Sequence, residues 1–249
     1  MEQEFQRGAG TQTIDRAAQL LTLVLEAERP RPLAELAGEA ALPKSTASRL
    51  LGALERQGLI QQRGRRGSFE PGPVVRRFAY RGQLVELAQP RMDVLAAASG
   101  ETINLAVPGP LGVEHLAQVE SRHFLGTGQW VGRRVPYHCT AVGKVLVAFS
   151  GIEPGPLDPH TPATISDPER FAAEVARVRR DGYASAMDEL EVGLTGIAAP
   201  VFGAGGHAFA ALSISGPTLR LDAQRMTELC PTLIQEARAL GHDMGADAA

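Results

Sequence analysis

The stretch "ALPKSTASRLLGALERQGLI" (residues 41–60) has two chemically different faces when it is drawn as a helix. At 100° per residue, its apolar positions fall together and predict a buried face of Ala47, Leu50, Leu51 and Leu54. The opposite side carries Ser45, Ser48, Arg49, Gly52 and Arg56. Such a face also occurs on ordinary surface helices. Small hydroxyl residues at the start of a helix, however, allow a close approach to base edges, which is typical of a DNA recognition helix.

The segments on either side of this helix favour the DNA-reading interpretation. Residues 13–29 and 32–42 predict two earlier helices, the first with Thr13 as its expected N-cap. After the recognition helix, residues 59–60 and 68–72 predict two strands joined by the basic turn "RGRRG". Three helices followed by a basic hairpin predict a winged helix-turn-helix domain over residues 1–72. The alternative is a solvated basic loop beside an amphipathic helix.

Charge is distributed unevenly between the two parts of the chain. Residues 1–81 hold 13 Lys and Arg against 9 Asp and Glu, whereas residues 82–249 hold 12 against 19. A basic first third on an acidic body predicts that only this part meets a polyanion, and the winged helix-turn-helix pattern makes double-stranded DNA the expected one. We expect Arg49 on bases or phosphates, the hydroxyl residues near base edges, and Lys44 and the hairpin arginines on phosphates. The complete set of expected DNA-binding residues is Lys44, Ser45, Thr46, Ser48, Arg49, Arg56, Arg63, Arg65 and Arg66.

The rest of the chain predicts a helical linker over residues 73–82 and a larger domain over 83–249. In the larger domain, residues 101–109, 112–121, 195–202 and 207–216 predict strands, with helices from about residue 140, over 167–182 and over 222–241. The order strand, strand, helix, helix, strand, strand, helix indicates an α+β fold with an antiparallel sheet flanked by helices.

Several classes of protein and site find no support in the sequence. No apolar run reaches the roughly 18 residues of a membrane span, and residues 1–12 lack a secretory signal, so we expect a cytoplasmic protein with no membrane partner. Two cysteines, Cys139 and Cys230, predict free thiols. Neither they nor the histidines show metal-binding spacing, so we expect no metal site and no cofactor. The histidines considered are His115, His123, His138 and His160.

A small-molecule pocket is the remaining candidate site in the larger domain. The helix beginning near Thr140 offers free backbone N–H groups that favour a carboxylate. Ser213 and Ser215 lie two apart on an apolar strand and therefore share one face, where they either contact a ligand or bond the local backbone. Trp130 and Cys139 could complete the pocket, although an aromatic residue beside a loop more often serves packing. No nucleophile elbow or phosphate-binding loop points to an enzyme.

The chain resembles the isocitrate-lyase-regulator (IclR) family of bacterial transcription factors. The resemblance rests on "LPKSTASRLLGALERQGLI" and, further on, "VPYHCTAVGKVLVAF", "RRDGYA", "DELEVGLTGIAAPVF" and "AALSISGPTLRL", and it covers nearly the whole chain. It departs at Ala41, where the family usually has glycine. An alanine at positive φ costs on the order of 1 kcal/mol, so we expect a slightly remodelled turn there.

The resemblance implies a GAF-like effector-binding domain over residues 83–249. By motif alignment it carries the family's pocket residues onto Ala141, Val142, Leu194, Gly196, Ser213 and Ser215. Position 196 is often cysteine in relatives that bind small keto acids, so Gly196 argues against a glyoxylate-type ligand and permits a larger one.

The function implied is regulation of a metabolic operon. The partners implied are a palindromic double-stranded DNA operator, a small-molecule effector such as a carboxylate, and further copies of the chain in a homodimer or a dimer of dimers. Two alternatives remain open: an enzyme with an N-terminal regulatory winged-helix module, and a protein-interaction module.

Overall fold

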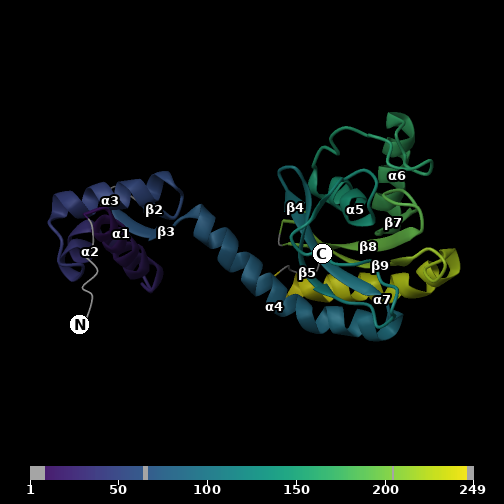
Figure 1. Cartoon of the computed structure of the whole chain (residues 1–249), viewed down its shortest axis with the longest axis horizontal. Helices are drawn as coiled ribbons and strands as arrows, with labels where there is room; N and C mark the ends of the chain where they lie inside the picture. The colour runs from purple at the N-terminus through teal and green to yellow at the C-terminus, as the bar shows by residue number, and fades with distance from the viewer. Residues whose placement is uncertain (1–8, 64–66, 204, 246–249) are drawn as a thin grey trace, which may run out of the picture. The chain divides into compact units, whose positions relative to one another are not determined.

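A computed structural model describes residues 9–63, 67–203 and 205–245 of the chain. The chain forms two compact units, residues 1–82 and residues 83–249. Helix α4, Pro73–Ser99, starts in the first unit and ends in the second. Each unit has its own hydrophobic core, so the two are described separately (Figure 1).

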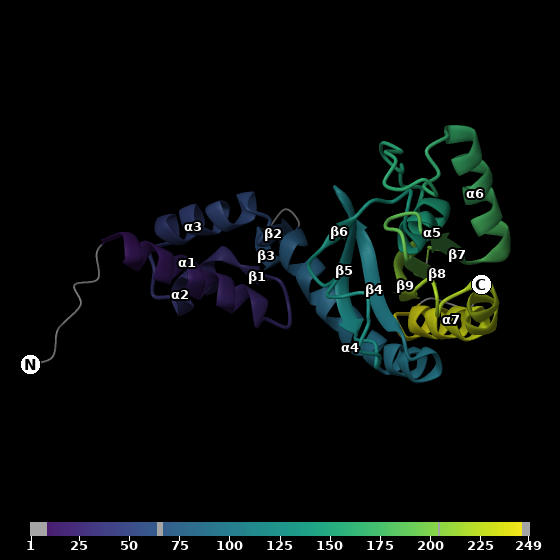
Figure 2. The ribbon, with the colours of Figure 1, turned by 45° about the vertical axis from the view of Figure 1, so that its right-hand side comes forward.

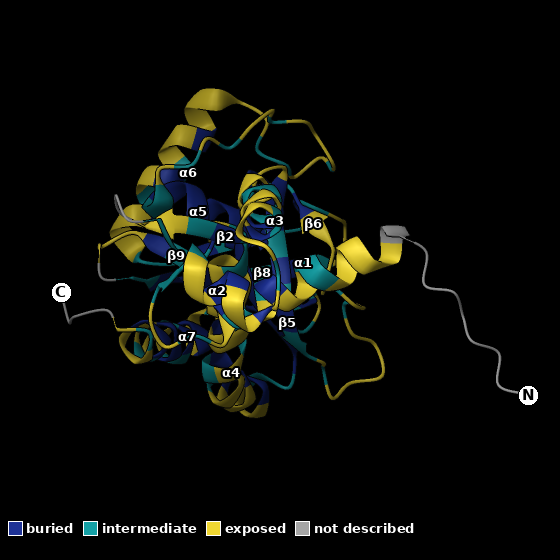
Figure 3. Ribbon diagram, turned by 90° about the vertical axis from the view of Figure 1, so that its left-hand side faces the viewer, coloured by how far each residue is buried: buried dark blue, intermediate teal, exposed yellow. Residues whose placement is uncertain are grey.

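The first unit is a small helical domain with a three-stranded sheet. Its elements are α1 (Ala9–Leu25), β1 (Arg31–Pro32), α2 (Leu33–Glu39), α3 (Lys44–Arg56), β2 (Ile60–Arg63) and β3 (Ser68–Pro71). Each helix carries both buried and exposed residues (Figure 3), and their buried faces meet around Leu20, Leu36 and Leu51. Helix α1 begins at Ala9, so the expectation that Thr13 is its N-cap is wrong. Strand β1, which was not expected, pairs with β3.

The turn between α2 and α3 keeps its left-handed backbone despite its alanine. Ala41 has φ 52°, and its N–H donates to the Gly38 carbonyl at 3.1 Å. The Leu42 N–H donates to the Ala37 carbonyl at 2.9 Å. These two bonds form the Schellman motif that usually places glycine at this position. The expected remodelling is therefore absent, and Ala41 retains the strain.

The second unit is built on a six-stranded sheet in the order β6-β5-β4-β9-β8-β7, with every neighbouring pair antiparallel. The strands are β4 (Thr102–Gly109), β5 (Gly112–Val119), β6 (Arg134–Val135), β7 (Ala184–Met187), β8 (Leu194–Phe202) and β9 (Ala208–Pro217). The four longer strands confirm the expected antiparallel α+β architecture. The short strands β6 and β7 were not expected.

Helices cover both faces of this sheet (Figure 2). Residues of α4 after Gln83 and of α7 (Ala223–Asp243) pack on one face, whereas α5 (Ala141–Ser150) and α6 (Pro168–Asp181) lie on the other. Side chains of a strand alternate between faces, so Leu212 and Ile214 join the α4/α7 core while Ala211 joins the α5/α6 core. No helix among the described residues is long and apolar enough to cross a membrane.

Candidate functional site

A pocket of about 460 Å³, including space open to solvent, lies on the α5 side of the sheet. The structure brings all the residues expected to bind an effector to the lining of this one pocket. They are Trp130, Cys139, Ala141, Val142, Leu194, Gly196, Ser213 and Ser215. They come from the loop before β6, the N-terminal end of α5, and strands β8 and β9. Residues far apart in the chain therefore form a single cavity.

The floor of the pocket follows from the register of three neighbouring strands. Asn104 of β4 pairs with Ser213 of β9, which in turn pairs with Ala198 of β8. Ser215 pairs with Gly196 in the same way. A Cβ atom built on Gly196 would lie 3.5 Å from Ser215 Oγ and 3.8 Å from Ala141 Cβ, which are ordinary contacts. The missing side chain at 196 therefore enlarges the pocket.

The N-terminal end of α5 forms another wall. Thr140 is the N-cap, and its hydroxyl accepts from the Gly143 N–H at 3.1 Å while donating to the Pro136 carbonyl at 2.8 Å. The first N–H groups of a helix have no partner inside the helix, which leaves those of Ala141 and Val142 at the pocket. Gly143 is required here, because a Cβ atom would lie 2.2 Å from the Tyr137 carbonyl oxygen. This wall can receive an anionic or carbonyl oxygen.

Three buried polar atoms that line the pocket have no hydrogen-bond partner among the described residues. They are Asn104 Oδ1, His115 Nδ1 and Ser213 Oγ. Their residues are 1%, 6% and 2% exposed. Buried polar groups are almost always paired, so three unpaired ones around a single cavity point to a polar ligand. Ser213 therefore does not bond the local backbone, which was the alternative interpretation of its role.

His115 and Trp130 form the aromatic wall of the pocket. Their ring centroids are 5.7 Å apart, and the Trp130 Nε1–H donates to Thr127 Oγ1 at 3.0 Å. Burial lowers the pKa of His115 to about 4, although a hydrogen bond with the Arg133 backbone acts in the opposite direction. His115 is therefore neutral at neutral pH. Tyr137, in the segment before α5, donates its hydroxyl to the Gly109 carbonyl at 2.9 Å.

A buried ion cluster holds α5 against the loop that follows β7. Lys144 is 1% exposed, and its Nζ lies 2.5 Å from Glu189 Oε1, 3.2 Å from Glu174 Oε1 and 3.1 Å from the Ser185 carbonyl. Burial raises the pKa of Glu189, while Lys144 opposes that shift. The loop carries Leu190, which lines the pocket. Glu189 therefore connects this loop to α5 through Lys144.

Sequence reasoning missed two central residues of the pocket. Asn104 stands in the otherwise apolar run "TINLAVPG", and a lone amide inside a buried strand was a usable signal. His115 gave no local signal, because its neighbours in the sequence do not distinguish it from a packing residue. Its place beside Asn104 and Ser213 depends on the pairing of β4 with both β5 and β9.

Helix α3 presents the predicted DNA-facing side chains on its outer surface. Ala47, Leu50 and Leu51 are buried, as the periodicity predicts. Thr46 is half-buried. The exposed residues of the predicted set on this helix are Lys44, Ser45, Ser48, Arg49 and Arg56.

The hairpin β2–β3 follows directly, with Gly58 at φ 67° after the end of α3. Arg63 is exposed and its Nη1 lies 3.3 Å from Glu70 Oε2, so the pairing partly neutralises it. Glu70 also accepts from Gln61 and Arg76, and these hydrogen bonds lower its pKa. Arg65 and Arg66, predicted at the hairpin tip, lie outside the described residues.

Two family models match the chain, one in each unit. The model for the IclR helix-turn-helix domain matches residues 13–64, and the model for the C-terminal domain of bacterial transcriptional regulator IclR matches residues 78–242. The transcriptional repressor IclR of Escherichia coli is 31% identical over 240 residues, covering 91% of this chain and 88% of the relative. These matches confirm the resemblance inferred from the motifs.

A second curated relative and a solved structure are similarly close. The HTH-type transcriptional regulator BhcR of Paracoccus denitrificans is 30% identical over 246 residues, covering 94% of this chain and 88% of the relative. An IclR homolog from Microbacterium hydrocarbonoxydans, solved in complex with 4-hydroxybenzoate, matches with a TM-score of 0.60 and 27% identity. That match covers 93% of this chain and 98% of the homolog. The curated relatives are named as regulators and not as enzymes.

Proposed function

This chain belongs to the IclR family of bacterial transcriptional regulators, and from that premise we propose the operator, the assembly and the effector class. The protein is a DNA-binding regulator with a helix-turn-helix domain and an effector-binding domain. It represses a metabolic operon in the cytoplasm, binds a palindromic operator as a homodimer or a dimer of dimers, and responds to a small carboxylic acid.

The exposed face of α3 supports the operator part of the proposal. Two recognition helices about 34 Å apart enter successive major grooves, so a two-fold symmetric protein reads a palindrome. Ser45 and Ser48 stand at the narrow N-terminal half of the face, where base edges can be approached. Arg49 follows them and would contact bases or phosphates, and the exposed Lys44 and Arg63 would contact the phosphates that flank the groove.

The three unpartnered polar atoms in the pocket are the single observation that carries the effector part. A carboxylate that accepts from the α5 backbone N–H groups would place further ligand groups beside Asn104, His115 and Ser213. His115 is neutral, and no Lys or Arg lines the described pocket. The backbone N–H groups at the start of α5 and the helix dipole therefore supply the positive potential that attracts an anion. The 4-hydroxybenzoate of the homolog combines a carboxylate with a ring and a hydroxyl, a pattern that this pocket also suits.

Ligand control follows from linkage between the two sites. The effector shifts the equilibrium between DNA-binding arrangements by the ratio of its affinities for them. Glu189 and Leu190 occupy the loop between β7 and β8, so a ligand that contacts Leu190 also acts on the ion cluster that fixes α5.

A fluorescence-anisotropy titration with DNA from the region upstream of the operon tests the operator part. Arg49→Ala should weaken binding by about 1–3 kcal/mol and leave the fold intact, whereas Arg180→Ala, an exposed arginine of α6, should leave affinity unchanged. Affinity should also fall steeply with salt, as phosphate contacts require. Equal binding by wild type and Arg49→Ala would show that α3 does not read the operator.

A thermal-shift screen of carboxylic acids, starting with 4-hydroxybenzoate, tests the effector part. A true ligand present at about 100 times its Kd stabilises the folded protein by about 2.7 kcal/mol. Replacing both serines, Ser213→Ala with Ser215→Ala, should weaken that ligand in calorimetry while leaving operator binding intact. Full-strength binding by the double variant contradicts the assignment of the pocket.

A further inference from the structure

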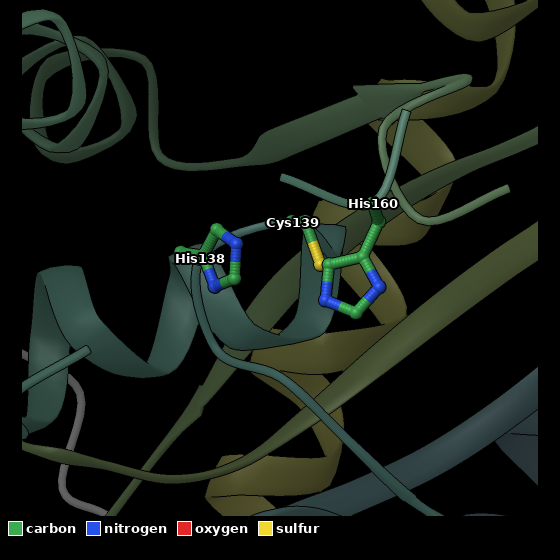
Figure 4. Close-up of side chains that lie close together, drawn as sticks. All are labelled: His138, Cys139 and His160. Carbon is green, nitrogen blue, oxygen red and sulfur yellow. The ribbon is translucent and has the colours of Figure 1, made fainter. Parts of the chain in front are cut away.

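Two histidines and a cysteine lie close together beside the pocket (Figure 4). None of them is among the unpartnered polar residues assigned to the effector, and only the cysteine lines the pocket. His138 and Cys139 directly precede α5, and His160 lies in the segment between α5 and α6. Each side chain offers one metal-ligand atom, and these atoms all lie within 4.8 Å of one another. The sequence predicts no metal site here, because the three residues form no helical pair and no paired-cysteine motif. The fold alone brings them together.

His138 is held as a metal-ligating histidine usually is. Its side chain is buried, and its Nε2 lies 2.8 Å from the Asp158 carbonyl oxygen. A carbonyl can only accept, so Nε2 carries the proton and Nδ1 carries a free lone pair. Nδ1 is buried and has no partner among the described residues. A ring that donates one N–H to a carbonyl and leaves its other nitrogen bare is typical of the coordination of metals by histidine.

Cys139 supplies the soft ligand of the group. It is a buried free thiol, and burial together with the nearby Glu189 raises its pKa to about 12. The thiol is therefore protonated and unreactive by itself, which argues against a nucleophile or redox role. A bound divalent metal ion displaces that proton, because a coordinating thiol is deprotonated outright.

His160 is the ligand that can move. Its side chain is exposed, its ring centroid lies 5.7 Å from that of His138, and its segment has neither helix nor strand. Zinc takes nitrogen at about 2.0–2.1 Å and sulfur at about 2.3 Å, so ligand atoms of a tetrahedral site lie roughly 3.3–3.7 Å apart. The exposed His160 ring can rotate toward His138 and Cys139, which brings its ligand atom closer to theirs.

Simple packing is the competing explanation for these three residues. It accounts for the two facing histidine rings and for the hydrogen bond from His138 to Asp158. It leaves the buried Nδ1 without a partner, and an unpaired buried polar atom destabilises the folded protein. A metal ion bonded to Nδ1 removes that destabilisation.

We propose that His138, Cys139 and His160 bind one divalent transition-metal ion of the zinc class. Two imidazoles and a thiolate are the donor set that such an ion prefers over Mg²⁺ or Ca²⁺. Three protein ligands leave the fourth position to water. Cys139 also lines the effector pocket, so the ion stands at the edge of that cavity. The site does not depend on the proposed operator or effector.

Cobalt(II) is the probe, because a thiolate bound to Co²⁺ gives a charge-transfer absorption band. The untagged full-length protein, stripped with EDTA and kept reduced, should bind one Co²⁺ per chain with that band, and Zn²⁺ should displace it. Cys139→Ser should abolish the band, whereas Cys230→Ser, which removes the other buried thiol, should keep it.

A second pair of variants, at exposed histidines, tests the site even if the substitution of a buried cysteine disturbs folding. His160→Gln changes an exposed side chain and should weaken Co²⁺ binding by more than about tenfold, while His207→Gln, another exposed histidine, should leave it unchanged. Far-UV circular dichroism checks that each variant is folded. Absence of the band in wild type, or equal affinity of wild type and His160→Gln, overturns the proposal.

Discussion

The two faces of the six-stranded sheet differ in the size of the side chains they present. On the face toward α4 and α7, the side chains of Ile197 in β8 and of Leu212 and Ile214 in β9 are fully buried in a continuous core. On the face toward α5, the alternate positions of the same strands are occupied by Ala198, Ser213 and Gly196. The period of two in a strand thus yields one filled face and one hollow face. The pocket follows from the small residues on alternate positions.

The face with the pocket, called the hollow face, has its own apolar core with α5 and α6, and it also holds a buried ion cluster. The filled face gains from apolar burial at about 25 cal/mol per Å². On the other face, α5 is held partly by the buried Lys144 and its two carboxylate partners. If this comparison is right, substitutions on the filled face change folding, and substitutions in the pocket change binding.

The largest effect is expected when the ion cluster of the hollow face is broken. Lys144→Met leaves the buried Glu189 without a cation, whereas Glu174 keeps its pairing with Arg177, and should lower the free energy of unfolding by about 3–5 kcal/mol in urea titrations. Adding Glu189→Gln removes one unpaired charge and should recover part of the loss. A double variant no more stable than Lys144→Met would show that the cluster does not act as a unit.

A matched pair of substitutions on adjacent strands tests the comparison directly. Leu212→Ala opens a cavity in the filled face and should cost about 2–5 kcal/mol. Gly196→Ala adds a methyl group at ordinary contact distances in the pocket and should change stability by less than about 1 kcal/mol. The ligand found by the thermal-shift screen should bind Gly196→Ala more weakly, because the pocket is smaller. Similar losses of stability in both variants would refute the distinction between the faces.

The pH dependence of stability probes His115 on the hollow face. Its pKa is lowered from 6.5 to about 4 by burial, so the unfolded chain binds a proton that the folded chain does not. The stability that the folded protein has while His115 is neutral is fully present above pH 6.5. It is lost as the pH falls toward 4, at about 1.4 kcal/mol per pH unit. Wild type should lose about 2 kcal/mol more than His115→Gln between pH 7 and pH 5. Parallel stability curves for the two proteins would show that His115 is not held neutral.

The smallest effect is expected in the first unit, where no pocket is involved. Ala41→Gly relieves the positive φ of the turn and should stabilise α2 and α3 by about 1 kcal/mol, seen as slower amide hydrogen exchange in α3. Ala40→Gly is the control, because Ala40 has φ −78° and gains nothing from glycine. It should speed exchange instead. The same sign for both substitutions would mean that the turn is not strained.

Elements with strong local patterns could be predicted from the sequence. The buried face of α3 and the hairpin after it followed from period and turn residues. Helix α6 matches the helix predicted over residues 167–182, with Asp167 as its N-cap and Gly182, at φ 77°, as its C-cap. Strands β1, β6 and β7 could not be predicted in this way, because segments of two to four residues owe their conformation to the strand beside them.

The sequence by itself determined helix α3 with its buried and exposed faces, the order of the longer elements and the shared face of Ser213 and Ser215. Each depends on residues a few positions apart, where helical and strand periodicity fix geometry. Only the tertiary structure decided that Asn104 and His115 complete the pocket, and that His160 meets His138 and Cys139. These meetings depend on strand pairing and on the packing of loops far apart in the chain, which no local pattern encodes.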